Sequence, residues 1–165
     1  MTPEDLVEIE LIKRLKYRYL RSIDQKLWDE LETCFVPEAT ARYGGGLYEF
    51  GNRDDIMAFC RQSMGATTFL SSHRCHHPEI DLIGDDEATG TWALEDTVIL
   101  TDFQLNIQGA AFYEDRYVKR DGEWKILHTG YKRSFEERVP RASIAGSKLT
   151  AEWWATDGRS TLGTS

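Results

Sequence analysis

The sequence predicts an α+β fold in which three N-terminal helices cover one face of an antiparallel sheet. In three segments before about residue 64, apolar residues recur at the three- to four-residue spacing of a helix face. From about residue 68 the pattern changes to long strand-like runs that are separated by short turns. The pair Asp121-Gly122 is a strong hairpin signal between two such runs. Long strands joined by short turns pair antiparallel, so the helices are expected to lie together on one face.

The first helix is expected to begin at Thr2, whose side chain can cap it, with Pro3 in its first turn. Its buried face is predicted to comprise Leu6, Ile9, Ile12, Leu15, Tyr19 and Ile23. The basic residues of this helix, Lys13, Arg14, Lys16 and Arg18, are expected in solvent. A second, short helix is predicted over residues 26–33, and Pro37 is expected to end that region.

A short hairpin is predicted next, with strands over residues 39–43 and 47–50 around three consecutive glycines. These glycines lack the spacing and the lysine of a phosphate-binding loop, so we interpret them as a flexible turn. Asn52 is expected to cap a third helix that runs to about residue 64 and turns Ile56, Phe59, Cys60 and Met64 inward. The strands that follow are predicted over residues 68–76, 79–83, 88–100, 104–119 and 123–135.

Residues 1–140 are expected to form one domain, and residues 141–165 a partly disordered C-terminal extension. Within the extension, residues 147–155 are expected to form a short helix that carries Trp153 and Trp154. The polar stretch 158–165 is expected to be disordered. Two adjacent tryptophans need cover, which the sheet, another subunit or the mouth of a pocket could supply. The sequence does not choose among these three.

The composition bounds the function. The chain has 165 residues, 41% of them hydrophobic, and a formal net charge of -8, which makes nucleic acid and anionic membranes poor partners. No apolar run has membrane-spanning length and the N-terminus lacks signal-peptide features, so a cytoplasmic location is expected. Cys34, Cys60 and Cys75 have no CxxC spacing and are interpreted as reduced, mostly buried thiols.

Three residues are candidates for proton-transfer chemistry: Tyr19, Asp24 and His73. A carboxylate can orient a histidine and raise its basicity, and a tyrosine can donate a proton. Structural roles stay open, since Asp24 could cap the second helix and Tyr19 could be ordinary core. Strand alternation would also place His77 on the same face as His73, but this spacing is not diagnostic of zinc and no HExxH is present. No metal is therefore expected.

An inward arginine is the next candidate. Alternation places Tyr131 and Arg133 on one face of the last strand, where an arginine needs an acceptor. That acceptor could be a substrate oxygen, or one of the carboxylates of Glu114, Asp115 and Asp96. Glu95 and Asp96 cannot form a close carboxylate pair, because adjacent strand residues point to opposite faces. His128 is interpreted as a structural strand histidine.

Several segments resemble one family. They include Leu27-Trp28-Asp29-Glu30-Leu31-Glu32, Ala88-Thr89-Gly90-Thr91-Trp92, Asp121-Gly122-Glu123-Trp124-Lys125-Ile126-Leu127 and Gly130-Tyr131-Lys132-Arg133-Ser134-Phe135-Glu136-Glu137. Over about residues 5–138 the chain is similar to the SnoaL-like branch of the nuclear transport factor 2-like superfamily, with the strongest resemblance to the scytalone dehydratase-like bile-acid 7α-dehydratases of bacteria. This resemblance implies a cone-shaped α+β barrel with a strongly curved sheet.

The resemblance also implies a site. Tyr19, Asp24 and His73 fall on the family's catalytic tyrosine, aspartate and histidine, and Tyr43 and Arg133 fall on pocket positions. The apolar substrate-binding lining is expected to come from Leu70, Trp92, Phe112 and Tyr131. The chain departs from the dehydratases at Leu105, where a tyrosine is expected, in a shorter segment 106–109, and in its tail after residue 140.

The function that the resemblance implies is a cofactor-independent dehydratase acting on a hydrophobic, steroid-like or polycyclic ketone. His73, held by Asp24, would act as the general base and Tyr19 as the acid. Two alternatives remain open: an isomerase or polyketide cyclase on the same fold, and a non-catalytic protein that binds a small ligand. The relatives imply a homo-oligomer, with a trimer expected.

Overall fold

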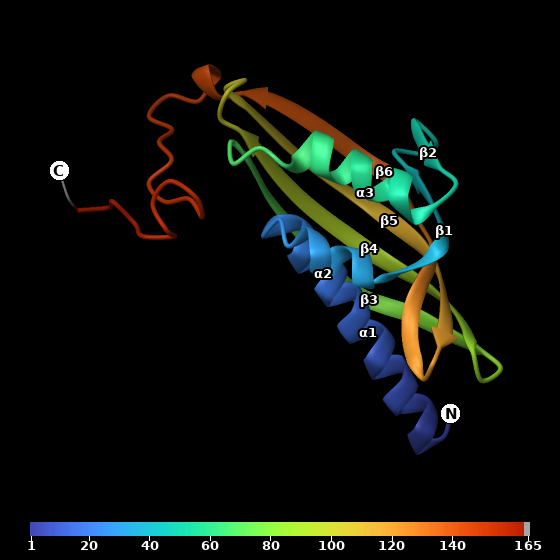
Figure 1. Ribbon diagram of the computed structural model, residues 1–165. Helices are drawn as coiled ribbons and strands as arrows, with labels where there is room; N and C mark the ends of the chain where they lie inside the picture. Colours follow the sequence, from blue (N-terminus) through green and yellow to red (C-terminus); the bar gives the residue numbers. More distant parts are fainter. Residues whose placement is uncertain (164–165) are drawn as a thin grey trace.

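The computed structural model describes residues 1–163 and has the predicted α+β architecture (Figure 1). Its elements, in chain order, are α1 (Pro3–Asp24), α2 (Trp28–Thr33), β1 (Phe35–Tyr43), β2 (Tyr48–Phe50), α3 (Arg53–Met64), β3 (Phe69–Ile83), β4 (Glu87–Leu100), β5 (Leu105–Arg120), β6 (Glu123–Pro140) and the 3₁₀ turn η1 (Arg141–Ser143). The prediction that helices precede long strands is confirmed.

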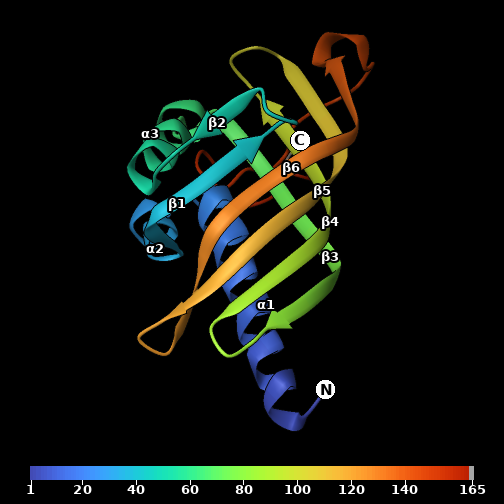
Figure 2. The same ribbon diagram turned by 90° about the vertical axis from the view of Figure 1, so that its right-hand side faces the viewer.

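Among the described residues, six strands form one curved, open sheet in the order β2-β1-β6-β5-β4-β3 (Figure 2). The pairs β3–β4, β4–β5 and β5–β6 are antiparallel, as expected. The pair β1–β6 is parallel, which is the exception in a sheet that is otherwise antiparallel as predicted. The two strands lie far apart in the sequence, and no hairpin dictates their relative direction.

The three helices lie on one face of the sheet, with α1 running along it and α3 covering the other half (Figure 1). Thr2 caps α1 through a capping box with Asp5, and Asn52 caps α3 by accepting a hydrogen bond from the main-chain N–H of Asp55. Both predicted caps are confirmed. Helix α2 begins at Trp28 without a side-chain cap, so Asp24 does not cap it.

Three strand predictions need correction. Pro37 lies inside β1, where the register to β6 shifts between Phe35 and Thr40, and so it does not end an element. The runs 68–76 and 79–83 form a single strand, β3, with an irregularity between His76 and Glu79. Strand β6 continues to Pro140, because it pairs with β5 as far as Leu105.

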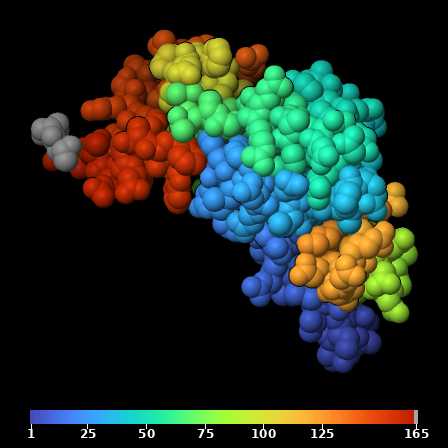
Figure 3. Space-filling view, in the orientation of Figure 1, coloured from blue at the N-terminus to red at the C-terminus, as the bar shows by residue number. Residues whose placement is uncertain are grey.

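The tail after β6 contains no helix over residues 147–155, contrary to expectation; it makes turns instead. Trp153 and Trp154 lie edge to face and line a cavity of about 230 Å³ with Leu70 and Ile99 of the sheet. Figure 3 shows this segment packed beside the body of the molecule. The sheet of the same chain thus supplies part of the tryptophans' cover. Of the stretch expected to be disordered, residues 164–165 lie outside the described part of the chain.

The core beneath α1 contains a buried ion pair. Lys16, expected in solvent, is fully buried, and its Nζ lies 2.7 Å from Oδ2 of Asp115. Asp115 also accepts hydrogen bonds from the hydroxyls of Tyr117 and Thr129. A basic side chain on a helix lies in solvent only where no other element covers it. Lys16 is buried because β5, which carries Asp115, covers this part of α1.

The cysteines and the helices meet two further expectations. Cys34, Cys60 and Cys75 are free thiols; the first two are buried and the third is half-buried. Burial raises the pKa of the Cys60 thiol to about 12, so it stays protonated at neutral pH. No helix in residues 1–163 is long and apolar enough to cross a membrane.

Candidate active site

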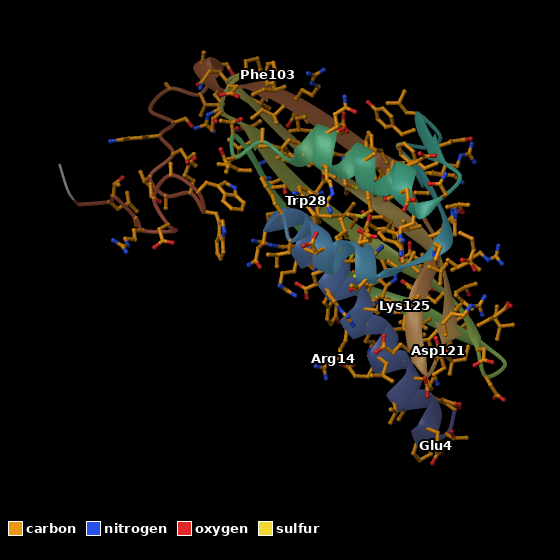
Figure 4. All side chains as sticks on the ribbon, viewed as in Figure 1. Glu4, Arg14, Trp28, Phe103, Asp121 and Lys125 are labelled. Atoms are coloured by element: carbon orange, nitrogen blue, oxygen red, sulfur yellow. The ribbon has the colours of Figure 1, made fainter. Side chains whose placement is uncertain are left out.

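A cavity of about 280 Å³ lies between α1, α3 and the inner face of the sheet. Figure 4 shows side chains of α3 and of the strands pointing toward one another across this region. It lies in the half of the molecule that carries Phe103, away from Glu4. The lining is mainly aromatic and apolar. It consists of Tyr19, Ile23, Tyr43, Tyr48, Phe59, Cys60, Ser63, Met64, Phe69, His73, Val98, Ile107, Tyr113, Tyr131, Arg133 and Glu136. The arrangement is typical of small-molecule sites, with few polar groups among hydrophobic walls.

Asp24 and His73 form the pair that the sequence predicted. The carboxylate sits at the last residue of α1 and holds His73 of β3 through two hydrogen bonds: Oδ1 lies 2.6 Å from the ring Nδ1, and Oδ2 accepts the main-chain N–H at 2.9 Å. Ser71 donates its hydroxyl to Oδ1 at 2.8 Å. A carboxylate on Nδ1 fixes the proton there, which leaves Nε2 with the free lone pair of a base.

The surroundings of Asp24 favour its charged form. Burial by itself would raise the pKa of this carboxyl group. The hydrogen bonds from the side chain and main chain of His73 and from Ser71, together with the charge of His73, outweigh burial and lower the pKa below its ordinary value. Asp24 is therefore an anion at neutral pH and can stabilise a positive charge that develops on the imidazole.

Two phenols lie together in the cavity. The hydroxyl oxygens of Tyr19 and Tyr43 are 3.2 Å apart, and both side chains are buried. Burial raises the pKa of each phenol well above its ordinary value. Both residues therefore keep their protons at neutral pH and can donate hydrogen bonds or a proton to a bound molecule.

Arg133 lies on the cavity wall between two carboxylates. Its Nη1 donates to Oδ1 of Asp96, and its Nη2 donates to Oδ2 of the same residue at 3.0 Å. Its Nε lies 3.2 Å from Oε2 of Glu136. Of the acceptors considered from the sequence, Asp96 is therefore the partner, whereas Glu114 pairs with Lys132 and Asp115 with Lys16.

The position of Arg133 depends on Gly109. A Cβ at residue 109 would lie 2.8 Å from Nη1 of Arg133 and 2.9 Å from the carbonyl oxygen of Phe135. The absence of a side chain on β5 leaves the space that the guanidinium occupies. Burial alone would lower the pKa of Arg133, but the hydrogen bonds and charge of Asp96 raise it, so the guanidinium stays charged.

The structure brings most of the predicted site residues together and leaves three outside. Tyr19, His73, Tyr43, Tyr131 and Arg133 line the cavity, and Asp24 lies directly behind His73.

Leu70, Trp92 and Phe112, expected in the apolar lining, do not line it. Leu70 faces the tail cavity, Phe112 is 51% exposed, and Trp92 donates its Nε1–H to the hydroxyl of Tyr117 under α1. These residues were expected in the lining because they are hydrophobic. Whether a strand residue reaches the cavity depends instead on the face of the sheet that it occupies and on its position along the strand.

Tyr113, Asp96 and Glu136 belong to the site, although sequence reasoning did not assign them to it. Tyr113 alternates with the buried Ala111 on β5, and this signal could have identified it in place of its exposed neighbour Phe112. Asp96 could be found only as one of several acceptors for Arg133. Glu136 stands in the family-like segment 130–137, but it was not assigned to the site because β6 was expected to end at residue 135.

The zinc alternative finds no support in the arrangement. The irregularity after His76 gives His77 a positive φ of 28° and exposes it, so the expected alternation with His73 breaks. Within residues 1–163, no group of three or more His, Cys, Asp or Glu side chains is placed to hold a metal ion. His128 lies outside the cavity described above, with its Nδ1 2.7 Å from the hydroxyl of Thr40.

Known proteins share this architecture. A family model described as SnoaL-like domain matches residues 4–130. A scytalone dehydratase-like protein from Novosphingobium aromaticivorans superposes with a TM-score of 0.76 at 24% identity, over 83% of this chain and 91% of that one. The hexachlorocyclohexane dehydrochlorinase LinA-type3 from Novosphingobium barchaimii superposes with a TM-score of 0.76 at 16% identity, over 90% and 97%. ActVI-ORFA from Streptomyces coelicolor gives a TM-score of 0.65 at 15% identity, over 76% and 96%.

Proposed function

This chain belongs to the SnoaL-like domain family, and on that premise we propose that it is a cofactor-independent lyase that removes water from a hydroxylated polycyclic ketone. The observation that carries the proposal is the contact between Asp24 and His73 at a cavity lined by protonated phenols. Two of its structural neighbours are named for eliminations: a dehydratase removes water and a dehydrochlorinase removes hydrogen chloride.

The proposed reaction begins at His73. Its Nε2 takes a proton from a carbon that is acidified by conjugation to the substrate carbonyl, and Asp24 stabilises the resulting imidazolium. The electron pair of the broken C–H bond moves toward the carbonyl oxygen and then forms the new C=C bond as the C–O bond breaks. Tyr19 gives its proton to the departing hydroxyl group, which leaves as water. The proton on His73 then passes to solvent, and the Tyr19 phenolate takes one back.

The remaining polar residues are assigned to substrate placement. Tyr43 orients the Tyr19 hydroxyl through their contact, and Arg133 donates to neutral oxygen atoms of the substrate. Aromatic walls that exclude water strengthen each of these polar contacts. Tyr131 and Tyr113, whose rings lie edge to face with centroids 5.4 Å apart, form part of the apolar surface for the substrate rings.

The test is a dehydration assay on a 3-oxo-Δ4 steroid with a 7α-hydroxyl group, chosen on the resemblance to bile-acid 7α-dehydratases. Absorbance reports the extended dienone and mass reports the loss of water. We expect turnover that His73→Ala reduces by about 10²–10⁴-fold and that Asp24→Asn also reduces strongly. The control is His76→Ala, an exposed histidine three residues along β3 that lies outside the cavity.

Other outcomes point elsewhere. A product of unchanged mass would favour an isomerase, and a cyclised product a polyketide cyclase. Ligand affinity that neither substitution alters, without turnover of any polycyclic ketone, would favour a protein that only binds.

We also propose that the protein is a homo-oligomer, with a trimer expected. The helices leave the outer face of the sheet uncovered, and that face carries the exposed aromatic rings of Phe112 and Phe135. Exposed aromatic rings on an uncovered sheet face are favourable contact points for a second copy of the chain. Light scattering should give three times the mass of one chain at micromolar concentration; the mass of a single chain would refute it.

A further inference from the structure

Arg133 is the one lysine or arginine that lines the cavity in the described part of the chain, and it is already paired with two carboxylates. An arginine grips a carboxylate with two nitrogens at once. In Arg133 the Nη1/Nη2 edge is already bound to both oxygens of Asp96, and the Nε side faces Glu136 at 3.2 Å. The Nε–H of Arg133 makes no hydrogen bond within the described residues, so a substrate oxygen can accept a hydrogen bond only at this edge, where Glu136 also lies.

The charges on this wall do not balance. The carboxylate of Asp96, with only 2% of its side chain exposed, neutralises Arg133. The carboxylate of Glu136, 43% exposed, adds a second negative charge beside the same guanidinium. At the other end, Asp24 places a further carboxylate behind His73. Lys26 lies near that end, but its Nζ donates to the main-chain carbonyls of Met64 and Phe69, and its side chain does not line the cavity.

The affinity of a ligand for this cavity therefore depends on the charge of the ligand. An anion would lose its hydration in an aromatic cavity and meet the negative charge of Glu136 without an unpaired cation to offset it. A cation would also lose hydration. Asp96 and Asp24 are already bound to Arg133 and His73, and Glu136 is already shared with Nε of Arg133 at 3.2 Å. An uncharged ketone or alcohol loses little and can use the hydroxyls of Tyr19 and Tyr43.

We propose that Glu136 is a specificity-determining residue that restricts this cavity to uncharged ring compounds and excludes their carboxylates. The inference rests on the proposed function, because it names the substrate class of the same site. Strand β6 contributes to this selectivity, because it extends past Phe135 and so brings Glu136 to the cavity.

The test compares two probes of the same shape, 2-naphthol and 2-naphthoate, by isothermal titration calorimetry at pH 7. The wild-type protein should bind 2-naphthol at least tenfold more tightly. Glu136→Gln should strengthen 2-naphthoate binding at least fivefold and leave 2-naphthol within twofold. The matched control is Glu137→Gln, which makes the same charge change one residue along the strand, outside the cavity lining, and should change neither affinity.

Two further measurements close the test: 2-naphthol binding to Ser63→Trp, and 2-naphthylmethylammonium binding to the wild-type protein, which should be weaker than 2-naphthol binding. Ser63→Trp adds an indole at an exposed position of α3 on the cavity wall and should abolish 2-naphthol binding. The proposal is overturned if the wild-type protein binds 2-naphthol and 2-naphthoate equally tightly, binds neither, or binds 2-naphthylmethylammonium more tightly than 2-naphthol. It is also overturned if Glu136→Gln and Glu137→Gln change 2-naphthoate affinity equally. Binding of 2-naphthol that survives Ser63→Trp would overturn it as well. Probe selectivity without any dehydration would instead refute the proposed function and leave this inference standing.

Discussion

Asp24 binds His73 twice, through the ring Nδ1 at 2.6 Å and through the main-chain N–H at 2.9 Å, although the two residues lie on different elements. The main-chain contact fixes the strand relative to the end of α1, and the side-chain contact fixes the tautomer of the ring. A single carboxylate thus couples the geometry of the fold to the basicity of the candidate base. Its removal is expected to affect both stability and activity.

The first prediction separates the two phenols. Tyr19→Phe should lower kcat by about 10²-fold or more, because it removes the proposed acid. Tyr43→Phe should lower kcat by a smaller factor, because Tyr43 only orients Tyr19 through a hydroxyl contact of 3.2 Å. Tyr17→Phe on the same helix, whose side chain is 48% exposed, is the control. Equal losses of kcat in Tyr17→Phe and Tyr19→Phe would contradict the assignment of Tyr19 as the proton donor.

The second prediction concerns acid stability. The pKa of Asp24 is lower in the folded protein than its ordinary value of 3.8, so its contribution to the free energy of unfolding is fully present above about that pH. The contribution is lost as the pH falls through the folded-state pKa. Urea unfolding should show Asp24→Asn less stable than wild type by about 1–3 kcal/mol at pH 7, with the difference shrinking below pH 4. Asp85→Asn, in an exposed turn, should show no such difference. A difference that grows on acidification would contradict this assignment.

The third prediction tests the space beside Arg133. Gly109→Ala should destabilise the protein by about 1–3 kcal/mol, because the new methyl group meets the main-chain carbonyl of Phe135 as well as the guanidinium. Substrate or probe affinity should change with it. Gly51→Ala, where no atom lies within 4 Å and φ is not positive, should be close to neutral in chemical denaturation. Unchanged stability in Gly109→Ala would show that the strand adjusts without cost.

The fourth prediction concerns the ion pair under α1. Lys16→Met should destabilise the protein by about 3–5 kcal/mol, because it leaves the buried carboxylate of Asp115 without its cation. The double variant Lys16→Met, Asp115→Asn should recover part of that loss. Lys13→Met, at a partly exposed position on the same helix, is the control. A double variant less stable than Lys16→Met alone would argue against charge burial as the cause.

Local sequence signals predicted the elements well. The apolar spacing, the caps at Thr2 and Asn52 and the turn at Asp121-Gly122 each depend on neighbours within a few residues, and the structure has the helices and hairpin they indicate. The errors arose where partners are distant. The parallel pairing of β1 with β6 and the continuation of β6 to Pro140 depend on strands far away in the sequence.

The sequence by itself determined the fold class and, with the family resemblance, proposed Tyr19, Asp24 and His73 as one set. Only the tertiary structure decided which other side chains share their cavity. It brought in Tyr113 and Glu136, paired Arg133 of the wall with Asp96, left out Leu70, Trp92 and Phe112, and buried Lys16. The physical reason is that residue spacing fixes which face of an element a side chain occupies. What that face meets depends on strand register and on which helix lies above it, and both arise from contacts across the whole chain.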